Sequence, residues 1–151
     1  MTETYILFTL VGTTYAVRTR DVQHMEMVEE ITPVPNAPPF VEGVVFSRGQ
    51  VVPVLNLRAR FGFERAAPDI RARLLVVQVS GRTIGLLVDS ARDFASMAEE
   101  AVRPPQEALT GLNGNYLEGV AVLNDRIVLV LDLAAVIDVA EPLVRGAKET
   151  V

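Results

Sequence analysis

The sequence contains one β-hairpin pattern twice, and this repeat limits the folds that the chain can adopt more than any other feature. Residues 42–57 (EGVVFSRGQVVPVLNL) and residues 118–133 (EGVAVLNDRIVLVLDL) align without a gap, 76 positions apart (118 − 42). Each segment has two apolar runs on either side of a polar turn, which is typical of two paired strands. The chain is therefore predicted to contain two copies of one β unit.

A second pair of hairpin patterns precedes these segments. Apolar residues alternate over 6–11 and resume after a turn at Gly12, and the same succession recurs around Gly81, 69 positions later (81 − 12). The repeat units then cover approximately 5–65 and 73–138, each with several short strands. Short strands separated by turns are typical of small barrels, in which closure of the sheet leaves no exposed edge.

Few helices are expected. One helical turn is predicted after each repeated hairpin, at 58–62 and at 134–139, and a short helix at 98–102 ends before two prolines. The segment 31–40 contains four prolines and is predicted to be an extended connector. The polar tail 141–151 is expected to fray or to form a small terminal helix.

The sequence has little of the chemistry that enzymes need. There is no cysteine and His24 is the only histidine, which excludes a thiolate or His-based metal site and an H-E-x-x-H helix. No Gly-x-Ser-x-Gly motif is present to hold a nucleophilic serine. The acidic pairs 29–30 and 99–100, like Asp89 and Asp93, are expected to face water. We therefore predict no catalytic activity and no metal or other cofactor, and we expect His24 to be a partly exposed strand residue.

The charge of the chain argues against two classes of partner. The net charge is −5, and an acidic surface repels phosphate, so neither nucleic acid nor an anionic membrane is an expected partner. An apolar run such as 127–131 is far shorter than the roughly 20 residues that a membrane-spanning helix needs. The first residues also lack the basic and apolar regions of a signal peptide. We expect a cytoplasmic protein that does not insert into a membrane.

Two features are candidates for protein contacts. Met25, Met27 and Ile31 alternate with polar residues, and methionine adapts to varied partners, although the same residues could belong to an ordinary core. Arg48 lies at the turn of the first repeated hairpin. Gly49 is expected to supply the left-handed backbone there, which leaves the arginine side chain free for a partner. The alternative is a solvated turn arginine.

The stretch FVEGVVFSRGQVVPVLNLR, residues 40–58, resembles the signature of CheW-like domains. In that family a strand leads through Asn-Leu-Arg-Gly into a strand that reads roughly Val-Pro-Val-Ile-Asp-Leu-Arg. The flanking segments 84–89 and 129–133 agree with the family pattern, so the similarity extends from about Tyr5 to Asp138. Phe46-Ser47 departs from the usual Asn-Leu.

The resemblance implies a mainly β fold of two five-stranded barrels with Src-homology-like topology that share a hydrophobic core, in agreement with the repeat. It implies one domain over residues 1–140, made of two intertwined barrel subdomains, followed by the tail 141–151. It also implies a non-enzymatic adaptor of bacterial chemotaxis that acts in the cytoplasm, where it is recruited to receptor arrays.

The resemblance implies two protein partners and the surfaces that meet them. One partner is the regulatory domain of a CheA-type histidine kinase, and the other is the helical hairpin tip of chemoreceptors. The residues expected to contact the kinase are Met25, Met27, Ile31, Val34 and Arg103. The residues expected near the receptor groove are Val22, Gly43, Val45 and Arg48.

Two alternatives stay open at the level of the sequence. The same fold and contacts would serve a CheW-like scaffold of another chemosensory pathway, such as pilus motility or gene regulation. A small-ligand binder or an enzyme on a barrel scaffold is the third reading, because a fold alone does not fix a function.

Overall fold

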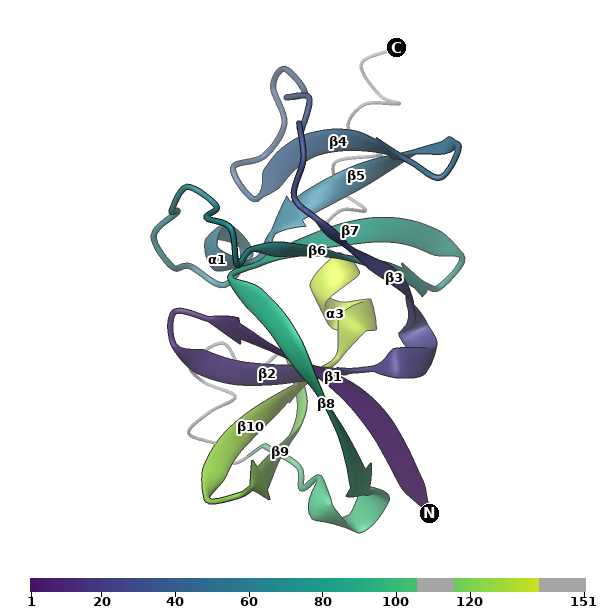
Figure 1. Ribbon diagram of the computed structural model, residues 1–151, viewed down its shortest axis with the longest axis vertical. Coiled ribbons are helices and arrows are strands. Elements are labelled where there is room, and N and C mark those ends of the chain that lie inside the picture. Colours follow the sequence, from purple (N-terminus) through teal and green to yellow (C-terminus); the bar gives the residue numbers. More distant parts are fainter. Residues whose placement is uncertain (106–115, 139–151) are drawn as a thin grey trace.

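The chain folds into two five-stranded β-sheets that lie one above the other, as the computed structural model in Figure 1 shows. The structure describes residues 1–105 and 116–138, so the tail 141–151 lies outside the described residues. Sheet A has the strand order β8-β1-β2-β10-β9, and sheet B has the order β3-β6-β7-β5-β4. The prediction of a mainly β fold with few short helices is confirmed, although the hydrogen-bonded order leaves each sheet open rather than closed into a barrel.

The strands are short, and most are joined in hairpins. Sheet A contains β1 (Thr2–Leu10), β2 (Thr13–Arg18), β8 (Ser90–Ala98), β9 (Leu117–Leu123) and β10 (Arg126–Leu131). Sheet B contains β3 (Val22–Met27), β4 (Val41–Ser47), β5 (Gln50–Asn56), β6 (Arg73–Val79) and β7 (Arg82–Val88).

Short helices follow the two repeated hairpins, as predicted. These are α1 (Leu57–Arg60) and α3 (Leu133–Ile137), and each begins where a side chain accepts a backbone hydrogen bond. The Asn56 side chain accepts from the N–H of Ala59, and Asp132, 76 positions later, accepts from Ala135. Both are ordinary N-cap contacts. Two 3-10 turns, η1 (Thr19–Asp21) and η2 (Glu99–Ala101), are the other helical elements of the described residues, and η2 replaces the helix expected at 98–102.

The two repeat units exchange strands. β1 and β2 pair in sheet A with three strands of the second unit, while β6 and β7 pair in sheet B with three strands of the first. Four pairings join the two units. β1 pairs antiparallel with β8 and β3 with β6, while the two parallel seams place Ala16 of β2 opposite Val130 of β10 and Gly85 of β7 opposite Val54 of β5. Each sheet is therefore complete only when both units contribute to it.

The main hydrophobic core lies between the sheets, where α3 is also placed (Figure 1). Its fully buried members come from strands of both sheets and include Phe8, Leu55, Leu75, Leu86 and Leu131. Each sheet also curls around a smaller cluster of its own. Alternate residues of the central strands thus face either the shared core or the interior of their own sheet, so both faces are apolar.

Four hairpin turns share an unusual backbone, in which both central residues have positive φ. These are the type I′ turns that match the twist of antiparallel strands. The first of the two central residues is not a glycine in any of these turns. Arg48 has a φ of 49°, and the following Gly49 has a φ of 83°. Gly49 thus has the left-handed conformation expected of it, and Arg48 has one as well. The four turns are Val11-Gly12, Arg48-Gly49, Ser80-Gly81 and Asn124-Asp125.

In each sheet, a glycine in the edge strand allows a connector segment to pair with that strand. Thr32 exchanges two backbone hydrogen bonds with Val44 of β4, and Arg103 does the same with Val120 of β9. A Cβ on Gly43 would lie 2.1 Å from the carbonyl oxygen of Thr32, and a Cβ on Gly119 would lie 2.7 Å from that of Arg103. Neither position has room for a side chain.

We predict that Gly119→Ala destabilises the protein by about 2 kcal/mol or more, because the backbone must shift to accept the methyl group. Gly12→Ala is the control: its φ of 78° is unfavourable for alanine, but no atom lies within 4 Å of its Cβ position. It should cost only about 1 kcal/mol. Urea unfolding followed by circular dichroism measures both values, and an equal cost for the two variants would contradict the steric argument.

Candidate functional site

The outer face of sheet B around β3 presents the two methionines singled out in the sequence. Residues of β3 alternate, so His24 and Glu26 point inward while Met25 and Met27 are exposed. Val34 in the following connector is also exposed, whereas Ile31 is partly buried and packs against the interior cluster of sheet B. Three of these four side chains are therefore accessible to a partner.

The β4–β5 hairpin adds an apolar pair that sequence reasoning missed. Phe46 and Val51 stand directly opposite each other, and 77% and 65% of their surfaces are exposed. The equivalent residues of the second unit, 76 positions later, are Val122 and Ile127, which are also paired and exposed. This recurrence is the signal in the sequence that could have identified them. The two hairpins lie at opposite ends of the molecule (Figure 1).

The residues expected near a receptor groove do not form one continuous surface. Arg48 is exposed at the hairpin tip and forms no hydrogen bond or ion pair with any residue that the structure describes. Val22 is partly buried and packs on the shared core. Val45 lies inside sheet B with 8% of its surface exposed, and Gly43 is closely covered by Thr32, so neither presents a side chain to a partner. Arg103 is exposed on the second unit.

The single histidine belongs to a polar cluster that joins the two edge strands of sheet B. His24 Nε2 lies 2.8 Å from Glu26 Oε2 and 3.1 Å from the hydroxyl of Ser47, which donates to the same carboxylate at 2.9 Å. A Ser-His-acid triad needs the acid on the other ring nitrogen, so this is not a catalytic arrangement. His24 is a partly buried strand residue, with 9% of its side chain exposed, and the cluster ties β3 to β4.

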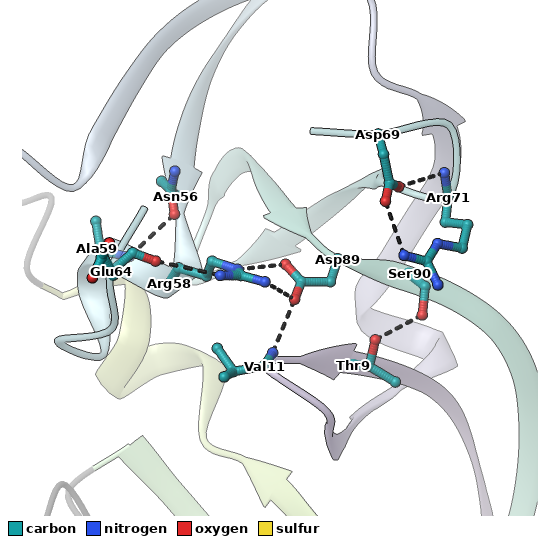
Figure 2. Close-up of polar contacts among 10 residues, drawn as sticks. All are labelled: Thr9, Val11, Asn56, Arg58, Ala59, Glu64, Asp69, Arg71, Asp89 and Ser90. Carbon is teal, nitrogen blue, oxygen red and sulfur yellow. Dashed lines mark hydrogen bonds and ion pairs between the residues drawn. The ribbon is translucent and has the colours of Figure 1, made fainter. Parts of the chain in front are cut away.

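An ion pair between Arg58 and Asp89 joins the two sheets, as Figure 2 shows. Arg58 donates from Nε to Asp89 Oδ1 at 2.8 Å and from Nη2 to Oδ2 at 2.6 Å, while the N–H of Val11 donates to Oδ2 at 2.9 Å. Arg58 lies on α1 after sheet B, and Val11 lies in the β1–β2 turn of sheet A. The expectation that Asp89 simply faces water is wrong, because its side chain is 28% exposed and fully engaged.

The surroundings of Asp89 favour its ionised form. Burial alone would raise the pKa of this carboxyl, but the hydrogen bonds from Arg58 and from the Val11 N–H outweigh it and hold the pKa below its ordinary value. The hydrogen bond to Asp89 raises the pKa of the Arg58 guanidinium. The pair therefore stays charged at neutral pH. The hydrogen bond to Asp89 also holds Val11 in the β1–β2 turn, where this β-branched residue has a strained φ of 50°.

Over the described ranges 1–105 and 116–138, no three His, Cys, Asp or Glu side chains gather in a way that could hold a metal ion. Within the same ranges, no helix has the length and apolar character needed to cross a membrane.

Comparison with known proteins gives one consistent result. A family model described as the CheW-like domain matches residues 4–141. The chain is 30% identical to the chemotaxis protein CheW of Klebsiella aerogenes over 129 residues, which cover 85% of this chain and 78% of that protein. It is 32% identical to CheW of Rhizobium meliloti, with 70% and 68% covered. The crystal structure of the scaffolding protein TtCheW from Thermoanaerobacter tengcongensis matches with a TM-score of 0.81 and 28% identity, covering 88% and 86% of the two chains.

We predict that Asp89→Asn lowers the free energy of unfolding by about 1–3 kcal/mol at neutral pH, because the amide cannot replace a charge-assisted bidentate contact. The depressed pKa of Asp89 stabilises the fold above the unfolded-state value of about 3.9, and this contribution is lost as pH falls through the folded-state pKa. The difference from wild type should therefore shrink in acid. Urea unfolding at several pH values measures it. Asp93→Asn, at an exposed position, is the control, and equal stability of all three proteins would contradict the role of the pair.

Proposed function

The chain belongs to the CheW-like family of chemotaxis scaffold proteins, and from that premise we propose that it is a non-enzymatic adaptor that couples chemoreceptors to a CheA-type histidine kinase. It acts in the cytoplasm and is recruited to receptor arrays. The observation that carries the proposal is the exposed apolar surface on sheet B, which has no function within the monomer. A polypeptide that joins two partners needs such surfaces and no reactive centre.

The kinase-binding surface consists of Met27 and Met25 on β3 together with Phe46 and Val51 on the β4–β5 hairpin. The His24–Glu26–Ser47 cluster supports this assignment, because it joins the inner side of the same two strands and so holds the outer side in a fixed geometry. An aromatic ring flanked by adaptable methionines is the composition of an interface centre. Val34 contributes at the edge of this contact, whereas Arg103, which pairs with β9 of sheet A, is assigned to a separate kinase contact on the second unit.

Receptor binding is assigned to Arg48 and to Val22, which is partly buried against the shared core. A guanidinium at a hairpin tip offers several donors to carboxylates or to carbonyls at a helix end, in a fork that lysine cannot copy.

We expect Met27→Glu and Phe46→Glu to leave the melting temperature nearly unchanged and to weaken binding of the kinase regulatory domain by about 2 kcal/mol each, as interface hot spots do. Ile31→Glu should instead lower the melting temperature, because it places a charge in a partly apolar interior. Titration calorimetry beside a thermal melt separates the two effects.

The matched control for these variants is Ile70→Glu, which adds the same charge at an apolar residue that is 80% exposed outside this surface. It should leave both affinity and melting unchanged. Unchanged kinase affinity in Met27→Glu and Phe46→Glu would remove the kinase assignment of this face.

We expect Arg48→Glu to melt within a few degrees of wild type and to lose receptor-dependent kinase activation in a reconstituted array, while Arg48→Lys retains only part of it. Asn124→Glu is the control, because Asn124 occupies the equivalent turn position of the second unit with a φ of 51°. It adds a charge with the same backbone demand and should leave activation intact. Full activation by the Arg48→Glu protein would show that Arg48 is only a solvated turn residue.

A further inference from the structure

One cleft in the described part of the chain has a charge opposite to that of the whole protein. It has a volume of about 300 Å³ and lies at one end of sheet A, where Arg71, Arg92 and Arg126 line it together with a single acid, Asp93. The lining thus carries a charge of +2 on a chain whose net charge is −5. Salt screens the interaction between exposed charges that are more than about 10 Å apart. The arginines that line the cleft, rather than distant acidic residues, therefore determine which charge it binds.

Three other clefts in the described residues show that this surplus is not general. One is strongly acidic, one is slightly acidic and one is balanced. The charged residues that line the strongly acidic cleft are Glu26, Glu29 and Glu30. The slightly acidic cleft is lined by Glu3, Glu99, Glu118, Arg18 and Arg20. The balanced cleft is lined by Arg58, Arg71, Asp69 and Asp89.

Two of the three arginines in the basic cleft have no partner in the described residues. Arg18, Arg20, Arg58, Arg65 and Arg71 all form ion pairs, and Arg71 donates to Asp69 at 2.9 Å. The side chains of Arg92 and Arg126 form no hydrogen bond or ion pair with another described residue. Their guanidinium donors are available to a ligand.

The floor of the cleft is polar and well ordered. The hydroxyls of Thr9 and Ser90 share a hydrogen bond of 2.7 Å across β1 and β8, and Figure 2 shows both side chains at the same end of the network as Arg71. Thr14, opposite Thr9 in the β1–β2 register, is only 6% exposed. Below this floor the interior of sheet A is filled by its own apolar cluster, so the cleft is the shallow mouth of that sheet. Mouths of curled sheets are common places for small ligands.

We propose that this cleft binds the phosphate group of a small phosphorylated molecule. Guanidinium groups match phosphate oxygens with paired hydrogen bonds, and hydroxyl groups on the floor complete the donor set. The small volume favours a small anion over an acidic protein segment, which needs a larger contact area. This inference does not depend on the adaptor role and concerns a different surface.

The test uses the full chain, with pyrophosphate as the probe and backbone amide chemical shifts as the readout. We expect saturable shifts at Thr9, Thr14, Ser90 and Arg92. Arg92→Gln and Arg126→Gln should each weaken binding about tenfold, in line with the loss of one charge-assisted contact. Arg48→Gln removes the same charge from an unpaired arginine on the other sheet and should bind pyrophosphate as the wild type does.

Inorganic phosphate and succinate are titrated in parallel to identify the chemistry that is recognised. Weaker saturation with inorganic phosphate at the same amides supports a site for a phosphate within a larger ligand. Three results would overturn the proposal: no saturable shift with pyrophosphate, equal weakening in Arg48→Gln, or binding of succinate as tight as that of pyrophosphate. The last result would indicate a carboxylate site instead.

Discussion

The parallel pairings of β2 with β10 and of β5 with β7 are the contacts on which the rest of the structure depends, because they join strands that no hairpin can bring together. Ala16 and Val130 meet although 113 residues (17–129) separate them in the sequence, and each seam completes a sheet that its own unit cannot complete. The same pairing directs Leu55, Leu86 and Leu131 into one core between the sheets. Separating the strands that pair across the two units would open that core. The two units must therefore fold as one cooperative body.

Equivalent backbone positions in the two units carry different surface chemistry. The close-approach glycines, the helix caps and the exposed hairpin pairs recur at an offset of 76, so the framework is nearly symmetric. The clefts are not symmetric. The cleft beside β3 is lined by glutamates, whereas the cleft at the mouth of sheet A is lined by arginines. A partner can therefore distinguish the two ends of the molecule by charge even though their backbones are alike.

The repeat, the hairpin turns and the helical turns after them could all be predicted from the sequence, because they depend on local periodicity and turn chemistry. The exchange of strands could not, since pairing within a unit and between units satisfies the same pattern. The sequence also could not separate Val45, which is buried, from Phe46, which is exposed, because both faces of these strands are apolar. The partners of Asp89 were missed for another reason: Arg58 and Val11 lie far from it in sequence and meet it only after the sheets pack.

The connector segments at Thr32 and Arg103 already occupy the outer edges of β4 and β9, where an incoming strand would otherwise add to the sheet. Recognition along these edges cannot use backbone hydrogen bonds, which are the same for every sequence, and must use outward side chains. Affinity for a partner can then be adjusted by single substitutions at the exposed positions without any change to the framework. Several copies of such a protein in one cell could diverge in partner choice while keeping the same fold, and insulation between parallel signalling routes would need only a few point mutations.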